Sequence, residues 1–171
     1  MEKNEIRKII LGTSNYDNVK NLNTVSITGD GGNAWGYFGP SYKKLAPRLV
    51  TYTPYSEKLE VLKSLKDDVI EYQKYRTLIE EEYIKSYYET RLKELDLEAL
   101  LKELKNRFGE NIVFLCHEPI DEFCHRRVFV DYIELLTGVY IPELKETESG
   151  IVYENPIRYK KRLINIIKEE Y

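Results

Sequence analysis

The residues best suited to chemistry are gathered in one short stretch of the chain. Both cysteines and both histidines lie between Cys116 and His125, and Glu118 and Arg126 lie with them. Thiol, imidazole and carboxyl groups can attack an electrophile or move a proton, and a guanidinium group can bind an anion. This stretch is therefore the first candidate for a functional site.

The chain around these residues is expected to run from a strand through a loop into a helix. The continuous apolar run 112–116 is typical of a strand buried on both faces, and a helix is predicted to begin near Cys124. Free amide donors and the positive end of the helix dipole favour an anion at a helix N-terminus. We therefore predict that Arg126 binds an anionic group there, and that the same positive field lowers the pKa of Cys124.

The other reactive groups of this stretch have predicted roles as well. His125 can transfer protons near neutral pH, and Glu118 can act as a general base or orient a sugar hydroxyl. Cys124 is a candidate nucleophile or orienting group, and Cys116 is a candidate ligand contact. The predicted ligand is a small anionic, nucleotide-like molecule, and the predicted reaction is hydrolysis or transfer at a glycosidic or phosphate-bearing centre. The alternative is a non-catalytic sensor or sequestering protein.

The same residues suggest two further kinds of chemistry, metal binding and a cysteine redox pair. Two cysteines and two histidines can hold zinc, but neighbouring Cys and His side chains point to different sides of an extended chain, and no Cys-x-x-Cys pair is present. The sequence therefore predicts no metal and no other cofactor. A redox pair of Cys116 and Cys124 stays open, although it lacks the Cys-x-x-Cys spacing. A purely structural role, with a buried cysteine and a capping histidine, stays open too.

A glycine-rich segment offers a second region for ligand contacts. Residues 29–34 match Gly-x-Gly-x-x-Ala, but no helix opens after them, so the match to a dinucleotide site is weak. The segment is either a plain turn or a ligand loop. In the second case the backbone of Gly31, the side chain of Asn33 and the ring of Trp35 would contact a flat or anionic ligand. Tyr42, a few residues later, is also a predicted ligand contact.

Hydrophobic periodicity predicts the elements that must position these groups. Strands are expected at 6–11, 24–28, 48–53 and 112–116, with a small strand at 139–144. Helices are expected within the segment 55–108, which has no glycine or proline, from about 124 to 137, and at 156–170. Asp96 is the predicted N-cap of one helix, and Gly109 and Gly138 are predicted helix ends.

This order of elements predicts the fold class. Strands that alternate with helices favour an α/β domain with a layered, largely parallel sheet flanked by helices, here with an expanded helical middle segment. Ligands bind such sheets beyond the carboxyl ends of the strands, and the segments 12–16, 29–37 and 116–127 all lie there. We expect one domain over residues 1–171, with a core at 5–145 and a C-terminal helical extension at 146–171.

Composition limits the classes of protein that the chain can belong to. With 42% hydrophobic and 32% charged residues it is typical of a globular protein, and two cysteines do not make a disulfide framework. No secretory signal and no run of roughly 18 apolar residues is present, so we expect a cytoplasmic protein without a membrane partner. The net charge of −3 does not favour nucleic acid, although basic clusters at 43–48 and 158–162 keep it as an alternative. The oligomeric state stays open.

Four phrases, in this order along the chain, resemble a known bacterial family. They are Val25-Ser26-Ile27, Tyr42-Lys43-Lys44-Leu45-Ala46-Pro47, Phe114-Leu115-Cys116-His117-Glu118 and Phe123-Cys124-His125-Arg126. Together they resemble the domain of unknown function 488 over residues 5–145. The resemblance implies a small soluble α/β domain and no particular reaction. The residues that match the family motif are Cys116, Glu118, Cys124, His125 and Arg126.

Overall fold

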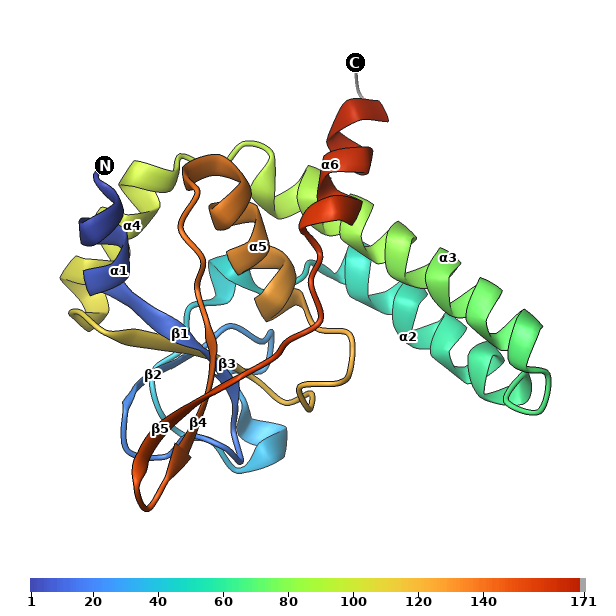
Figure 1. The fold of residues 1–171 in the computed structure, drawn as a ribbon. Coiled ribbons are helices and arrows are strands. Elements are labelled where there is room, and N and C mark those ends of the chain that lie inside the picture. The colour runs from blue at the N-terminus through green and yellow to red at the C-terminus, as the bar shows by residue number, and fades with distance from the viewer. Residues whose placement is uncertain (170–171) are drawn as a thin grey trace.

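The structure is a computed structural model that describes residues 1–169, and it has the predicted α/β fold (Figure 1). In chain order the elements are α1 (Lys3–Ile9), β1 (Ile10–Asn15), β2 (Asn23–Ser26), α2 (Leu49–Ser64), α3 (Val69–Tyr87), α4 (Leu97–Phe108), β3 (Ile112–Cys116), α5 (His125–Thr137), β4 (Glu143–Thr147), β5 (Gly150–Glu154) and α6 (Lys160–Glu169). Short turns of 3-10 helix lie at Asn33–Trp35 and Lys43–Leu45, and a π-helical turn at Tyr88–Leu92 follows α3.

The sheet is largely parallel, as predicted, and its strands follow the order β2-β3-β1-β4-β5. Among the strands of residues 1–169, only β5 runs antiparallel, as the partner of β4 at one edge. Strands β1 and β4 approach closely at Gly12, where a Cβ atom would lie 2.7 Å from Cγ of Leu144 and 2.7 Å from the carbonyl oxygen of Pro142. Glycine at position 12 therefore avoids a clash in this strand pair.

Strand β3 is buried along its whole length, and its side chains alternate between two packed layers. Ile112, Phe114 and Cys116 belong to the main core, which also contains Val128 and Phe129 of α5. Val113 and Leu115 belong to a smaller cluster on the other face, with Tyr16 and Leu144. Cys116 therefore faces the same layer as α5, and this places the predicted reactive residues on one side of the sheet.

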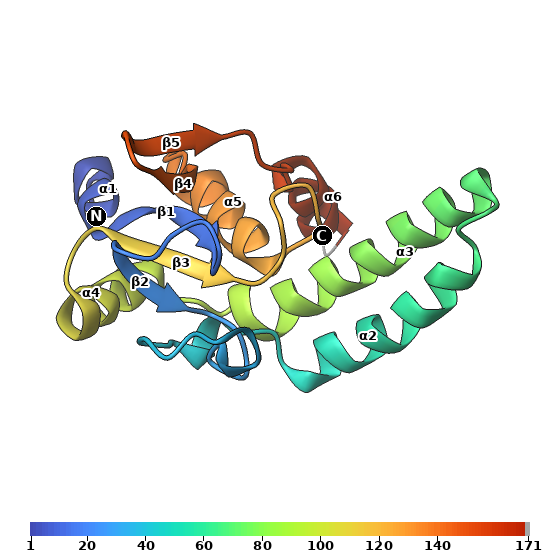
Figure 2. The same ribbon diagram turned by 90° about the horizontal axis from the view of Figure 1, so that it is seen from below.

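The expanded middle segment is a pair of long helices, α2 and α3, that extends away from the sheet (Figures 1 and 2). The C-terminal part of α3 returns to the domain and contributes Ile84 to the main core. Asp68 caps α3 and Asp96 caps α4, because each side chain accepts a hydrogen bond from a backbone N–H in the first turn. Gly109 ends α4 and Gly138 ends α5, both with positive φ, as the sequence predicts.

Two of the predicted strands are wrong in part or in whole. The first strand begins only at Ile10, because the residues before it form α1, from which Ile6 and Ile9 reach the core. A short apolar run fits the hydrophobic period of a helix as well as that of a strand. The strand predicted at 48–53 is the start of α2, which continues through Pro54. Proline removes one helical hydrogen bond there, and the packing of α2 against α3 outweighs that loss.

The C-terminal segment is not purely helical, which corrects the predicted extension. Strand β4 lies a few residues beyond the predicted strand at 139–144, and β5 adds a further strand at the sheet edge. Helix α6 packs against α3 and α5. Position 170, the predicted end of the last helix, lies outside the described residues. Among residues 1–169, no helix is long and apolar enough to cross a membrane.

Candidate functional site

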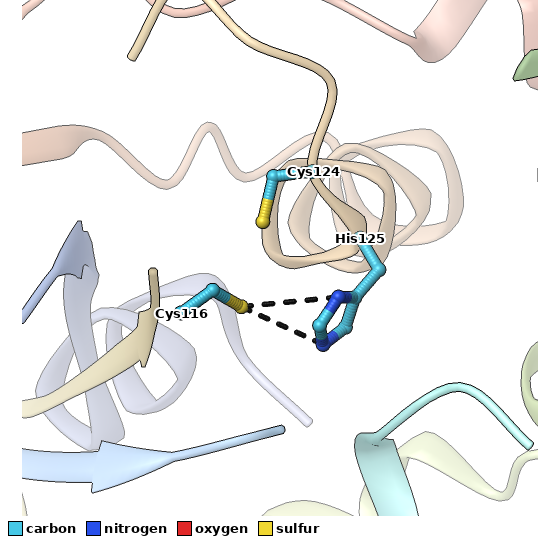
Figure 3. A group of neighbouring side chains, drawn as sticks. All are labelled: Cys116, Cys124 and His125. Carbon is cyan, nitrogen blue, oxygen red and sulfur yellow. Dashed lines mark hydrogen bonds between the residues drawn. The ribbon is translucent and has the colours of Figure 1, made fainter. Parts of the chain in front are cut away.

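The loop between β3 and α5 brings both cysteines to one place (Figure 3). Cys116 is the last residue of β3, and Cys124 is the N-cap of α5, where its sulfur accepts a hydrogen bond from the backbone N–H of Arg126 over 3.4 Å. Figure 3 shows the sulfur of Cys124 pointing toward the strand end that carries Cys116. The sulfur atoms and a ring nitrogen of His125 lie within 4.8 Å of one another, although the residues are separated along the chain.

His125 is held between a strand end and Cys116. Its Nε2 lies 2.7 Å from the carbonyl oxygen of Ile27, so Nε2 donates the hydrogen bond. Sγ of Cys116 lies beside both ring nitrogens, 3.5 Å from Nε2 and 3.8 Å from Nδ1, and in the neutral ring Nδ1 is then the acceptor. The imidazole is therefore oriented so that it can take a proton from the Cys116 thiol.

The two thiols differ in their electrostatic surroundings. Burial alone would raise the pKa of Cys124, but a hydrogen bond from Cys116 and the positive charge of Arg126 outweigh burial and hold this pKa well below its usual range. Burial, with the neighbouring Cys124 thiolate, raises the pKa of Cys116 well above its usual range. The arrangement favours a thiolate at Cys124 beside a protonated thiol at Cys116.

The side chain of Arg126 donates hydrogen bonds to partners within the protein. Its Nη1 donates to Sγ of Cys124 over 3.2 Å, and its Nε and Nη2 donate to the two carboxylate oxygens of Glu143 over 3.1 and 2.7 Å. The residue is 1% exposed and does not line the pocket described below. This placement corrects the prediction that Arg126 binds a ligand anion, because most of its donors are already used to hold Cys124 and Glu143.

Glu118 lies on the other side of Cys124. Burial and the negative charge of the Cys124 thiolate raise the pKa of Glu118 well above its usual range, which favours the protonated acid. Its Oε2 is buried without a hydrogen-bond partner among the described residues, and the nearest cation, Nη1 of Arg126, is 3.9 Å away. A neutral carboxyl group with a free oxygen is suited to donate a proton to a bound molecule.

A pocket of about 500 Å³ opens beside these groups. Cys124, Glu118 and His125 form one part of its lining, and the carboxyl end of β2 contributes Thr28 and Gly29. The remaining walls are largely aromatic, with the rings of Trp35, Tyr52, Tyr55, Tyr83 and Phe123. This volume lies within the usual range for a small-molecule site.

A stacked ring pair forms one wall of the pocket. The rings of Trp35 and His117 lie 4.6 Å apart with an interplanar angle of 6°. Burial lowers the pKa of His117, which favours its neutral, flat form. Trp35 is 57% exposed, so part of its surface is available to a further flat molecule.

The structure separates the predicted ligand contacts into two groups. Trp35 lines the pocket, as expected. Gly31 and Asn33 belong to the same loop but do not line the pocket. Tyr42 is buried elsewhere, where its hydroxyl donates to Glu103 over 2.8 Å. Cys116 does not line the pocket either, because it lies in the core behind it.

Glu143 is a residue of the site that the sequence analysis missed. It is 1% exposed at the start of β4, and it pairs with Arg126 and accepts a hydrogen bond from Thr13 over 2.5 Å. One signal was present, because Glu143 interrupts an otherwise apolar segment in which Val139, Ile141 and Leu144 are buried. A carboxylate in such a segment needs a buried partner.

The sulfur atoms of Cys116 and Cys124, with a ring nitrogen of His125, could also hold a metal ion. Thiolate sulfur and imidazole nitrogen are the ligands that Zn²⁺ prefers, and the atoms of Cys116, Cys124 and His125 lie close enough together for one ion. Spacing along the chain therefore does not exclude a metal here, contrary to the prediction, because the fold brings the atoms together without a Cys-x-x-Cys motif. Two N–H groups of Arg126 already point at Sγ of Cys124, so a cation there would face an arginine.

Each of the two basic clusters includes side chains that pair with acidic groups. Lys44 contacts Glu103 over 3.1 Å. In the second cluster Arg158 pairs with Glu134, and Arg162 pairs with Glu80 over 3.0 Å. Such pairing is typical of a solvated protein surface, and the nucleic-acid alternative gains no support from it.

No family model, curated protein or solved structure matches the chain.

Proposed function

We propose that the protein is a hydrolase or transferase that binds a flat, nucleobase-like ring in this pocket and acts on it through the Cys124 thiolate. One observation carries the proposal. The Cys124 thiol, to whose sulfur Arg126 donates a hydrogen bond, and the Glu118 carboxyl group, whose pKa burial raises, both line one part of a pocket whose other walls are largely aromatic. A nucleophile and a proton donor that face the same space form the minimal set for covalent catalysis.

The ligand class follows from the lining of the pocket. Stacked aromatic rings bind flat molecules, and the Trp35–His117 pair leaves Trp35 largely exposed to one. Among the described residues that line the pocket there is no lysine or arginine, whereas Asp30 and Glu118 both carry carboxyl groups. An uncharged ring therefore suits the pocket better than the anionic group that we expected from the sequence.

The proposed reaction has two steps. Sγ of Cys124 attacks an electrophilic carbon of the ligand, the bond from that carbon to the leaving group breaks, and the carboxyl group of Glu118 gives its proton to the leaving group. The Glu118 carboxylate then takes a proton from water or from an acceptor hydroxyl, whose oxygen attacks the same carbon. Cys124 departs as a thiolate, so both residues return to their starting states.

The other polar groups of the site support the proposed roles of Cys124 and Glu118. Arg126 and the N-terminus of α5 stabilise the negative charge that returns to Cys124 in each cycle. His125 is held by Ile27 and acts as a positioning residue. The five residues that resemble the motif of domain of unknown function 488 all lie at or beside the pocket, and we propose the relationship on that ground. The reaction needs reduced thiols, and we propose a cytoplasmic setting for that reason.

The test is a binding and trapping screen with free bases, nucleosides and nucleotides, followed by native and denaturing mass spectrometry. We expect ring compounds to bind the wild type and to leave a covalent adduct on Cys124 that is lost in Cys124→Ser. Serine is a good N-cap, so this variant keeps the start of α5. Absence of binding by every ring compound, or full turnover in Cys124→Ser, would overturn the proposal.

A matched pair of variants tests the stacking wall. Trp35 lines the pocket, whereas Phe38 is 86% exposed in the same loop and does not line it. We expect Trp35→Ala to weaken binding of a ring ligand by roughly tenfold, which corresponds to about 1.4 kcal/mol of stacking and burial. Phe38→Ala is expected to bind like the wild type. Equal losses in both variants would place the ligand outside the pocket.

A further inference from the structure

Cys116 is a buried thiol that the reaction proposed above does not use as a reactant. It lies behind Cys124, does not line the pocket, and its sulfur is within 4.8 Å of the sulfur of Cys124. Nδ1 of His125 lies 3.8 Å from Sγ of Cys116 and can accept its proton. A thiolate at the pocket wall, with a second thiol and a base directly behind it, is the arrangement that converts an oxidised cysteine into a disulfide.

Access to the two sulfur atoms is ordered. A small oxidant can enter the pocket of about 500 Å³, which Cys124 lines with 2% of its surface exposed, whereas Cys116 is fully buried and does not line the pocket. Cys124 is therefore the thiol that reacts first, and Cys116 is the thiol that resolves the product. The positive charge of Arg126, 3.2 Å from Sγ of Cys124, stabilises the attacking thiolate.

We propose that the Cys124–Cys116 pair also reduces small hydroperoxides, with Cys124 as the attacking thiolate and Cys116 as the resolving thiol. This second activity depends on the same Cys124 thiolate as the proposed function, but it needs neither the aromatic walls nor a ring ligand. It uses Cys116 and the acceptor nitrogen of His125, neither of which takes part in the reaction proposed for the ring ligand.

The reaction balances in two steps. The thiolate sulfur of Cys124 attacks the distal oxygen of the hydroperoxide, the O–O bond breaks, and the alkoxide or hydroxide leaves with a proton from Glu118. Cys124 is now a sulfenic acid. The Cys116 thiol gives its proton to Nδ1 of His125 and attacks Sγ of Cys124, and hydroxide leaves with that proton as water. Two electrons have passed from the two thiols to the peroxide, and a disulfide remains.

A low-molecular-weight thiol is the expected reductant. It reaches the disulfide from the pocket, where it gives its proton to Nδ1 of His125 and attacks Sγ of Cys124, and the released Cys116 thiolate takes that proton from His125. A second thiol gives its proton to the Glu118 carboxylate, displaces the mixed disulfide and regenerates the Cys124 thiolate. Two reducing thiols are oxidised for each peroxide reduced.

The experiment uses the full chain, freed of metal by a chelator and treated with one equivalent of hydrogen peroxide before intact-mass analysis. We expect the wild type to lose two hydrogen atoms and to gain no oxygen. Cys116→Ser is expected to gain one oxygen atom and to react with dimedone, a probe of sulfenic acid, because the resolving thiol is missing. Cys124→Ser is expected to keep its mass, since the remaining thiol is shielded.

Three results would overturn the inference. They are oxygen gain without a disulfide in the wild type, oxidation of Cys124→Ser at the wild-type rate, and one bound metal ion per chain as purified that blocks both thiols. The ring-ligand screen separates this inference from the proposed function. Ligand binding with Cys124 adducts but no disulfide would remove the peroxide activity alone, and peroxide turnover without ring binding would remove the proposed function alone.

Discussion

Nη1 of Arg126 donates a hydrogen bond to Sγ of Cys124 over 3.2 Å, while Nε and Nη2 of the same guanidinium group are held by Glu143. The carboxylate of Glu143 fixes the orientation of the guanidinium plane, and the guanidinium in turn directs positive charge at the sulfur. Because all three residues are buried, water screens these charges weakly. The reactivity of Cys124, at the start of α5, therefore depends on Glu143, which lies on strand β4.

The first prediction concerns the reactivity of Cys124 with iodoacetamide. The pKa of this thiol is held well below its usual range, so its thiolate persists at pH values where an ordinary thiol is protonated. We expect the alkylation rate of Cys124 to stay high as the pH falls below neutrality. The measurement is the rate across pH with peptide mapping, and Cys124→Ser is the control. A midpoint near the ordinary value of about 8.5 would contradict the prediction.

The second prediction concerns the buried Arg126–Glu143 pair. Removing one partner leaves an unpaired buried charge, so we expect Arg126→Gln to lower the free energy of unfolding by roughly 3 to 5 kcal/mol. The same change should slow alkylation of Cys124 near neutral pH, because the thiolate loses its nearest cation. Urea unfolding and the alkylation assay measure the two effects. Arg107→Gln, at a half-exposed residue, is the control and should change the stability little.

The third prediction concerns the pH dependence of stability that Glu118 contributes. The folded-state pKa of Glu118 is raised, so the folded protein holds a proton that the unfolded chain releases above about pH 4.3. This contribution is fully present below that pH and is lost as the pH rises toward the folded-state pKa. We expect Glu118→Gln to gain stability relative to the wild type over the same rise. Urea unfolding at several pH values measures this difference, and a constant difference would argue against a protonated Glu118.

The fourth prediction concerns the close approach of β1 and β4. A Cβ atom at position 12 would meet backbone and side-chain atoms of the neighbouring strand, so we expect Gly12→Ala to destabilise the protein by about 1 to 3 kcal/mol. Gly29→Ala is the matched control, because nothing lies within 4 Å of a Cβ there. Thermal unfolding of both variants measures the effect, and equal stabilities would show that β4 can move to accommodate the methyl group.

Local patterns were enough to predict the elements that form the centre of the site. The unbroken apolar run ending at Cys116 predicted a buried strand, and the apolar stripe of α5 with Gly138 after it predicted a helix that begins near Cys124. Those two predictions place both cysteines at one edge of the sheet. The patterns failed at 48–53, where β-branched residues and Pro54 favour a strand and packing against α3 determines a helix.

The sequence by itself determined the α/β class, the strand that ends at Cys116, and the helix N-terminus at Cys124, because hydrophobic period and helix capping act within a few residues. Only the tertiary structure decided what Arg126 does. Its side chain could have met a ligand, but pairing with Glu143 on β4 turns it toward Cys124. The tertiary structure also decided that Trp35 lines the pocket while Tyr42 does not. Contacts of this kind join residues far apart along the chain, and no local spacing encodes them.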